Sequence, residues 1–284
     1  HPPAMGTPRA VDPTPARPRI AAEGPLVPGE SVGITAAPDV DVRSSAASLA
    51  RGEFVGREHE LSVLRTALDS VDLGRGGVVA VEGTAGIGKT RIVEHLAGEA
   101  SQRGVRVVWT RCVADAGRPP LWPWHEVLTQ IDSAPNADAP IHIEPAEADS
   151  PADPDHDRFL FLSATVDRLL RCGRGEHTLI VVDDLHSADA ASLQLLRLLM
   201  DRIDGSGLLV VVTTRRSDAQ DLAALDETLS AIDRSRSGER LAVGPLGVDD
   251  VGRLLEAVAS RSGDPVDQAE LTALSRTLHQ RTGG

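Results

Sequence analysis

The sequence predicts an α/β fold, in which a parallel sheet of about five strands is covered by helices on both faces. Two observations predict it. Short apolar runs alternate along the chain with longer segments whose apolar residues recur every three or four positions. The short runs are apolar throughout, which is typical of parallel strands buried on both faces.

The first helix shows the helical period clearly, with Leu61, Leu64 and Leu68 on one face. The same pattern predicts helices at residues 57–71, 89–100, 121–131, 158–171, 190–203, 222–232, 249–260 and 266–280. Short apolar runs predict strands at residues 77–81, 105–110, 178–182, 208–213 and 240–243.

Composition divides the chain further. Residues 1–50 hold many of the prolines and no sustained apolar period, which predicts a linker or an extended arm. Residues 51–244 are expected to form the core. Within it, residues 133–157 are rich in Pro, Ala and Asp and are expected to be a flexible acidic insertion. The chain begins with His1 rather than Met, which suggests a piece of a longer protein.

Overall composition excludes several classes of protein. The net charge of −13 makes the chain a poor candidate for direct DNA binding. Cys112 and Cys172 have neither metal-ligand spacing nor a partner framework for disulfides. No apolar run reaches the roughly 18 residues that span a bilayer, and no signal peptide is visible, so we expect a cytoplasmic location without membrane contact.

Residues 83–90 match the phosphate-binding pattern G-x-x-x-x-G-K-[ST], between a predicted strand and a predicted helix. Glycines let this P-loop turn its N–H groups toward a phosphate, and the helix adds its positive end. Lys89, the only lysine of the chain, is expected to reach the β- and γ-phosphates of ATP, and the Thr90 hydroxyl to coordinate Mg²⁺. The alternative is a glycine-rich turn without a ligand. The expected nucleotide-binding residues of the loop are Gly83, Thr84, Ala85, Gly86, Ile87, Gly88, Lys89 and Thr90.

Two carboxylates end the predicted strand at residues 178–182, at the sheet edge where parallel folds bind ligands. We expect Asp183 to be the magnesium ligand and Asp184 to orient the attacking water. The alternative is a solvated turn.

Polar side chains near these carboxylates add candidates. Arg215 is expected to sense the γ-phosphate, with Arg216 as its rival and a surface arginine as the alternative. Asp189 is expected to cap the helix that follows, and His186 is a loop histidine or a catalytic group. The aromatic residues at 122–124 are interpreted as packing rather than as a platform for a base.

These motifs together resemble the STAND branch of P-loop ATPases, especially the ATPase modules of LuxR-type regulators with a large ATP-binding region and of SARP activators. The resemblance covers about residues 52–284. It rests on residues 54–58, 83–91, 120–124, 182–189, 213–215 and 244–246.

The resemblance implies a P-loop NTPase whose residues 245–284 are the start of a truncated helical lid. It implies a switch that exchanges ADP for ATP, hydrolyses ATP slowly, self-associates, and acts on DNA and RNA polymerase through other domains of a bacterial transcription activator. It carries over Val55, Arg57 and Arg91 as nucleotide contacts. Ser187 stands where such relatives commonly have Trp, and residues 281–284 look like the start of a Gly-Asn-Pro-Phe segment.

Two other functional classes remain open at this stage. One is a turnover ATPase or small-molecule kinase, although the sequence shows no acceptor pocket. The other is a non-catalytic P-loop scaffold for partner docking.

Overall fold

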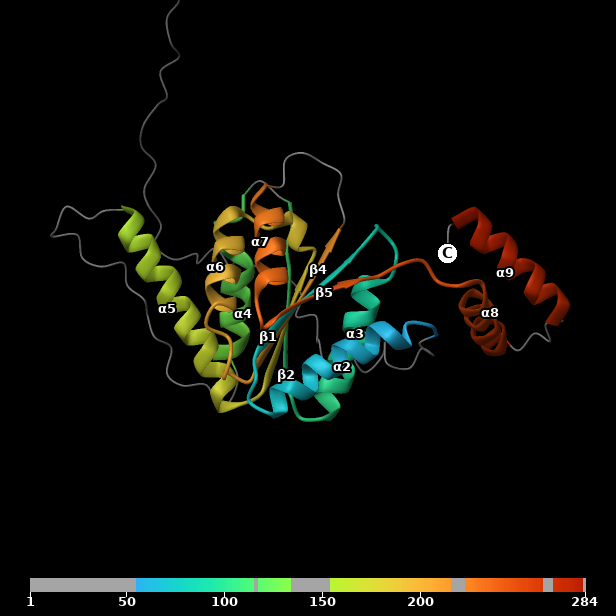
Figure 1. Cartoon of the computed structure of the whole chain (residues 1–284), viewed down its shortest axis with the longest axis horizontal. Helices are drawn as coiled ribbons and strands as arrows, with labels where there is room; N and C mark the ends of the chain where they lie inside the picture. Colours follow the sequence, from blue (N-terminus) through green and yellow to red (C-terminus); the bar gives the residue numbers. More distant parts are fainter. Residues whose placement is uncertain (1–54, 115–116, 134–153, 216–222, 263–267, 283–284) are drawn as a thin grey trace, which may run out of the picture. The chain divides into compact units, whose positions relative to one another are not determined.

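A parallel sheet of five strands lies between layers of helices (Figure 1), and its strand order is β2–β3–β4–β1–β5. A computed structural model of the chain describes residues 55–114, 117–133, 154–215, 223–262 and 268–282. The strands are β1 (Gly77–Gly83), β2 (Arg106–Arg111), β3 (Thr178–Asp183), β4 (Leu208–Arg215) and β5 (Gly238–Ala242). The predicted fold class is thus confirmed, and each predicted strand is present.

Strand register aligns the polar strand ends. Gly83 at the end of β1 is opposite Arg215 at the end of β4. Arg111 at the end of β2 is opposite Asp183 at the end of β3. Because all five strands run the same way, these ends meet at one carboxyl edge of the sheet, which is where open α/β sheets bind ligands.

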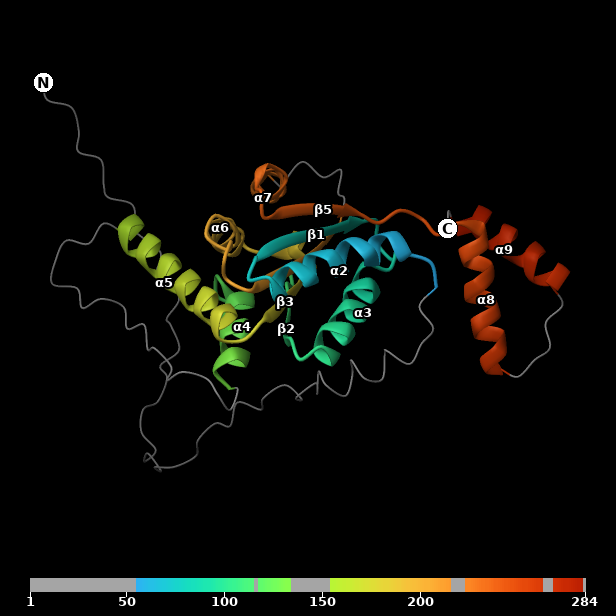
Figure 2. The same cartoon turned by 60° about the horizontal axis from the view of Figure 1, so that its bottom comes forward.

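Helices cover both faces of the sheet, and the strands alternate their apolar side chains between them. On one face, α2 (Glu58–Asp72) and α3 (Lys89–Gln102) bury a cluster that includes Val79 and Val211. On the other face, a second cluster includes Val78 and Val210. Figure 2 shows the two helical layers. The second layer consists of α4 (Trp122–Asp132), α5 (Pro154–Gly175), α6 (Ala190–Met200) and α7 (Ala223–Arg234).

Two helices follow the sheet, α8 (Val248–Ser262) and α9 (Gln268–Thr282), and they pack against each other. Helix α8 also contacts Gly56, ahead of α2, and Glu58, the first residue of α2. A Cβ added to Gly56 would lie 2.8 Å from Asp250 Cγ, and Arg253 lies 3.4 Å from Glu58. This helical pair occupies the range in which the sequence predicts the start of a lid.

The structure differs from the prediction for residues 133–157. Helix α5 begins at Pro154, so the end of the predicted insertion is helical. Proline favours a first helical turn, because its fixed φ suits the helix and the N–H that it lacks has no partner there. The rest of this segment, apart from Ser133, and the predicted arm at residues 1–50 lie outside the described residues. In the described ranges, no helix has the length and apolarity of a membrane-crossing segment.

Candidate nucleotide-binding site

Two glycines shape the loop between β1 and α3. Gly86 has a φ of 78° and Gly88 a φ of 100°, a region in which other residues are strained. An added Cβ would meet nothing within 4 Å at either position, so the backbone conformation rather than space requires glycine there. Within the described residues no side chain caps the first turn of α3. Its N–H groups therefore remain available to an anion.

Lys89 places its ammonium group inside this loop. Its side chain is buried, and Nζ donates hydrogen bonds to Gly83 O (3.0 Å) and Thr84 O (2.9 Å). Burial lowers the Lys89 pKa and the charge of Arg215 adds to this, while Asp184 and Asp183 oppose it. An ammonium group has three N–H donors, so these two bonds leave one donor for a phosphate oxygen.

Asp183 meets the first turn of α3 across the sheet edge. It is 2% exposed, and its Oδ1 accepts hydrogen bonds from Thr90 Oγ1 (3.0 Å) and Thr213 Oγ1 (2.6 Å). A hydroxyl and a carboxylate are oxygen ligands of the kind that Mg²⁺ prefers. In the described part of the chain, no group of three or more His, Cys, Asp or Glu could hold a metal ion.

Asp184 is held in a fixed orientation on the other side of the same strand end. Its φ of 57° lies in the left-handed region, and its N–H donates to Thr213 Oγ1 (2.9 Å). Arg111 donates two hydrogen bonds to Asp184 Oδ2, from Nε (3.1 Å) and Nη2 (2.6 Å). Burial alone would raise the pKa of Asp184, but Arg111, His186 and Arg215 together hold it below its ordinary value. The carboxylate is therefore ionised at neutral pH, and both bonds from Arg111 reach the same oxygen, Oδ2.

His186 and Arg215 complete the charged surroundings of Asp184. His186 Nδ1 is buried, lies 3.9 Å from Asp184 Oδ1, and has no hydrogen-bond partner within the described residues. Burial lowers the pKa of His186, and the positive charges of Arg215 and Lys89 lower it further. The negative charge of Asp184 opposes this shift. Arg215 is exposed, and its charge acts on both Lys89 and His186. Its predicted rival at position 216 lies outside the described residues.

The remaining predicted contacts lie around the loop. Arg57, with a φ of 96°, donates from Nη2 to Ile87 O (3.3 Å) and pairs with Glu60 at 3.0 Å. It therefore contacts the P-loop main chain. Val55 is half-buried just ahead of Arg57, and Arg91 is exposed in the first turn of α3. Asp189 caps α6 as predicted, since its Oδ1 accepts from the Ser192 N–H at 3.0 Å.

Two residues of this site were not assigned a role in it from the sequence. Arg111 pairs with Asp184, although the two are 73 positions apart. Thr213 binds both members of the acidic pair. The available signal for Arg111 was a cation directly after an apolar strand, at the sheet edge where the carboxylates are expected. The signal for Thr213 was a hydroxyl at the end of a strand that is otherwise apolar.

Comparison with known proteins identifies a family whose model matches this chain. A family model of the AAA ATPase domain matches residues 53–212, more than half of the chain. An uncharacterized protein of Rhizobium meliloti (strain 1021) is 28% identical over 88 residues, which are 31% of this chain and 8% of that protein. The chain thus covers less than a tenth of this relative.

Several solved structures have a similar backbone fold. One chain of the HORMA:CdnC:Trip13 complex of E. coli MS115-1 matches with a TM-score of 0.47 and 16% identity, over 84% of this chain and 77% of that one. RuvB of Thermotoga maritima matches with a TM-score of 0.47 and 16% identity, over 80% of this chain and 59% of that one. Cdc6p of Pyrobaculum aerophilum matches with a TM-score of 0.49 and 17% identity, over 80% of this chain and 57% of that one.

Proposed function

The chain belongs to the AAA ATPase domain family, and we propose that its sheet edge binds ATP with Mg²⁺ and hydrolyses the nucleotide slowly. The observation that carries this proposal is the hydrogen bond of 3.0 Å from Thr90 Oγ1 to Asp183 Oδ1. It joins a P-loop hydroxyl to a strand-end carboxylate 93 positions further along the chain. A divalent cation beside a phosphate cradle is the arrangement that phosphoryl transfer needs.

Phosphate binding is assigned to residues 83–90. The N–H groups at the start of α3 would bind phosphate oxygens, and the Lys89 ammonium group would donate a hydrogen bond from its third N–H to the β- or γ-phosphate. Thr90 and Asp183 would hold Mg²⁺, which supplies positive charge to the phosphate oxygens. Val55, Arg57 and Arg91 are proposed as further nucleotide contacts, and the bond from Arg57 to Ile87 O supports the position of Arg57 beside the loop.

Hydrolysis is assigned to the charged groups beyond the γ-phosphate. Asp184 Oδ1 accepts a hydrogen bond from the attacking water and orients it, while Arg111 keeps Oδ2 occupied. Arg215 neutralises the charge that develops on the γ-phosphate oxygens. These groups lie close to Lys89, because burial lowers the Lys89 pKa and the charges of Arg215, Asp184 and Asp183 all act on it as well.

We further propose that the module is a regulatory switch of a bacterial transcription activator. The sequence resemblance supports this context, in which nucleotide state controls self-association, and other domains bind DNA and RNA polymerase. Contacts of α8 support a route for such control. Asp250 packs against Gly56, Arg253 pairs with Glu58, and the intervening Arg57 bonds to the P-loop. A conformational change in the P-loop can therefore be transmitted through Arg57 and its neighbours to α8, in the predicted lid.

Thermal unfolding with and without ATP and Mg²⁺ tests nucleotide binding. A ligand at about 100 times its dissociation constant adds about 2.7 kcal/mol to the free energy of unfolding, so the melting temperature should rise. Lys89→Ala should remove the rise. The matched control Arg103→Gln, at the opposite end of α3, should retain it. A wild-type melting temperature that millimolar nucleotide leaves unchanged contradicts the proposal.

Two further assays test the alternatives. Release of ADP that depends on an added acceptor molecule would identify a kinase rather than an ATPase. In cells that carry the full-length activator, Asp184→Ala should reduce transcription from its promoter. Normal transcription by that variant would favour a non-catalytic scaffold.

A further inference from the structure

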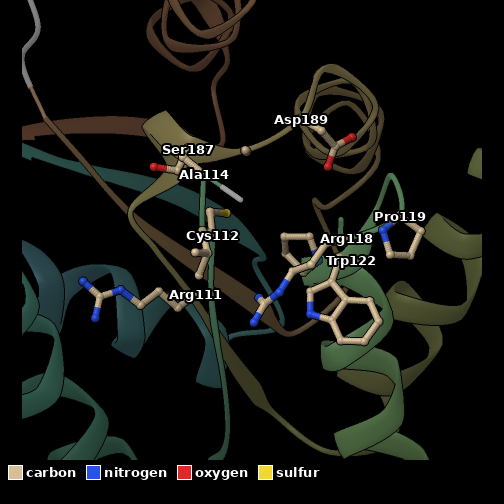
Figure 3. A pocket seen from close by; sticks show the side chains of 11 residues that line it. Arg111, Cys112, Ala114, Arg118, Pro119, Trp122, Ser187 and Asp189 are labelled. Atoms are coloured by element: carbon tan, nitrogen blue, oxygen red, sulfur yellow. The ribbon is translucent and has the colours of Figure 1, made fainter. Parts of the chain in front are cut away.

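A cavity of about 190 Å³ lies at the sheet edge beside the Arg111–Asp184 pair (Figure 3). Residues 111–114, from the last residue of β2 onward, and residues 187–189, from the last residue of η1 (Leu185–Ser187) onward, form two of its walls. The start of α4 and the residues just ahead of it form the third. We propose that this cavity, which shares Arg111 with the proposed nucleotide site, binds a small organic carboxylate with an apolar body.

The cation that would receive the carboxylate is Arg118. Its guanidinium group lies over the Trp122 ring, 5.5 Å from the centroid, and Figure 3 shows the two side chains together at the cavity. His125 stacks on the same indole with centroids 5.6 Å apart. An arginine that stacks on an aromatic face keeps its N–H donors in the guanidinium plane free for an anion.

Neither nearby carboxylate competes strongly for Arg118. Glu126 lies 4.0 Å from it, but each Glu126 oxygen already accepts a hydrogen bond of 2.6 Å, from Thr110 Oγ1 and from Trp122 Nε1. Asp189 accepts three hydrogen bonds, from Ser192 N, Ser192 Oγ and Leu121 N. These bonds hold Asp189 against the N-terminus of α6 and the main chain ahead of α4. Of the two arginines that line the cavity, Arg111 is bonded to Asp184, so Arg118 is the one placed to receive an anion.

The other walls are suited to an apolar body. They include Val113, Pro119, Pro123 and Ala188. A cavity of about 150 Å³ holds a benzene ring, so this one has room for a single ring with a short acidic arm.

Phenylacetate and its neutral analogue phenylacetamide are suitable probes, because they share a shape and differ in charge. The aromatic ring of either probe shifts nearby NMR signals, and the indole N–H signal of Trp122 reports the cavity directly. The signal is assigned by its loss in Trp122→Phe. The titration is run without nucleotide, so its outcome is independent of ATP binding.

Phenylacetate should shift the Trp122 signal saturably and bind about tenfold more tightly than phenylacetamide, as expected for one charge-assisted hydrogen bond at a partly exposed site. Arg118→Gln should abolish that preference, and the control Arg174→Gln, in the last turn of α5, should keep it. Unshifted Trp109 and Trp124 signals in Arg118→Gln would show that the fold is intact. Equal binding of the two probes, a preference that survives Arg118→Gln, or no shift at about 10 mM phenylacetate overturns the proposal.

Discussion

Thr90 and Asp183 form a direct hydrogen bond of 3.0 Å, although β4 lies between β1, the strand that precedes the helix of Thr90, and β3, the strand that ends at Asp183. The contact is possible because α3 begins at the carboxyl end of β1 and turns its first residues toward β3. Thr213 on the intervening β4 binds the same Asp183 oxygen at 2.6 Å. Three polar side chains from three segments thus meet at one point, where a divalent cation would lie beside the phosphates.

The first prediction concerns the Thr90 hydroxyl. Thr90→Val keeps the side-chain shape and removes the oxygen, so ATP should still bind but Mg²⁺ should no longer strengthen binding. The measurement is the ATP-induced rise of the melting temperature, in Mg²⁺ and in EDTA. The wild type should show a larger rise in Mg²⁺, and Thr90→Ser, which restores a hydroxyl, should show the same difference. A Mg²⁺-dependent rise that persists in Thr90→Val would refute the assignment of Thr90 as a ligand.

The second prediction concerns the loop backbone. Gly88→Ala places a Cβ at a φ of 100°, where it clashes with nothing but strains the main chain by about 1–2 kcal/mol. Denaturant unfolding without nucleotide should show a loss of that size. Gly175→Ala is the control, because its Cβ also meets open space and its φ is ordinary, so its effect should stay within about 0.5 kcal/mol. Equal effects at the two positions would argue against backbone strain.

The parts of this site that were predictable from sequence are local ones. Residues 83–90 contain the whole loop motif in one continuous stretch, and the apolar runs before them and before Asp183 predict strands that end at one edge. The strand order was not predictable in this way, because parallel strands that are neighbours in the sheet can lie far apart in the sequence. Arg111 illustrates the consequence, since its bond to Asp184 depends on β2 lying beside β3.

The cavity beside the site was likewise missed. The sequence marks the aromatic residues at 122–124 as packing elements, and Trp124 is indeed 2% exposed and bonds to Ser192 O. Trp122 instead lies at the cavity wall with Arg118 over its ring. The distinction between the two depends on the helical phase of α4 relative to α6. A single sequence shows the helical period of α4, but it does not show which neighbouring element each face of the helix contacts.

The third prediction concerns the Arg111–Asp184 pair. Arg111→Ala removes the two hydrogen bonds that orient the carboxylate, so the water that Asp184 positions should be misplaced. We expect phosphate release at saturating ATP to slow about tenfold or more, while the KM for ATP changes by less than about twofold, because Arg111 contacts no phosphate in the proposed arrangement. Arg111→Lys, which keeps the charge, should recover part of the rate. Faster hydrolysis in Arg111→Ala would show that the pair restrains Asp184 instead.

The last prediction concerns pH and the contact between α2 and α3. Arg65 donates two hydrogen bonds to Glu99, one of them 2.8 Å long from Nε, and these bonds hold the Glu99 pKa below its ordinary value although burial opposes the shift. A depressed carboxyl pKa stabilises the fold above the pKa of the unfolded chain, about 4.3 for Glu, and that contribution is lost as the pH falls through the folded-state pKa.

A double-mutant cycle of Arg65→Gln and Glu99→Gln measures this contribution. Because Arg65 is 40% exposed and the pair is screened by solvent, the coupling free energy at pH 7 should be only about 0.5–1 kcal/mol. It should fall toward zero as the pH drops below the unfolded-state value of about 4.3 and through the lower folded-state pKa of Glu99. Denaturant unfolding of the four variants at several pH values provides the measurement. A coupling that stays constant across this range would show that the two side chains stabilise the helix contact by packing rather than by charge.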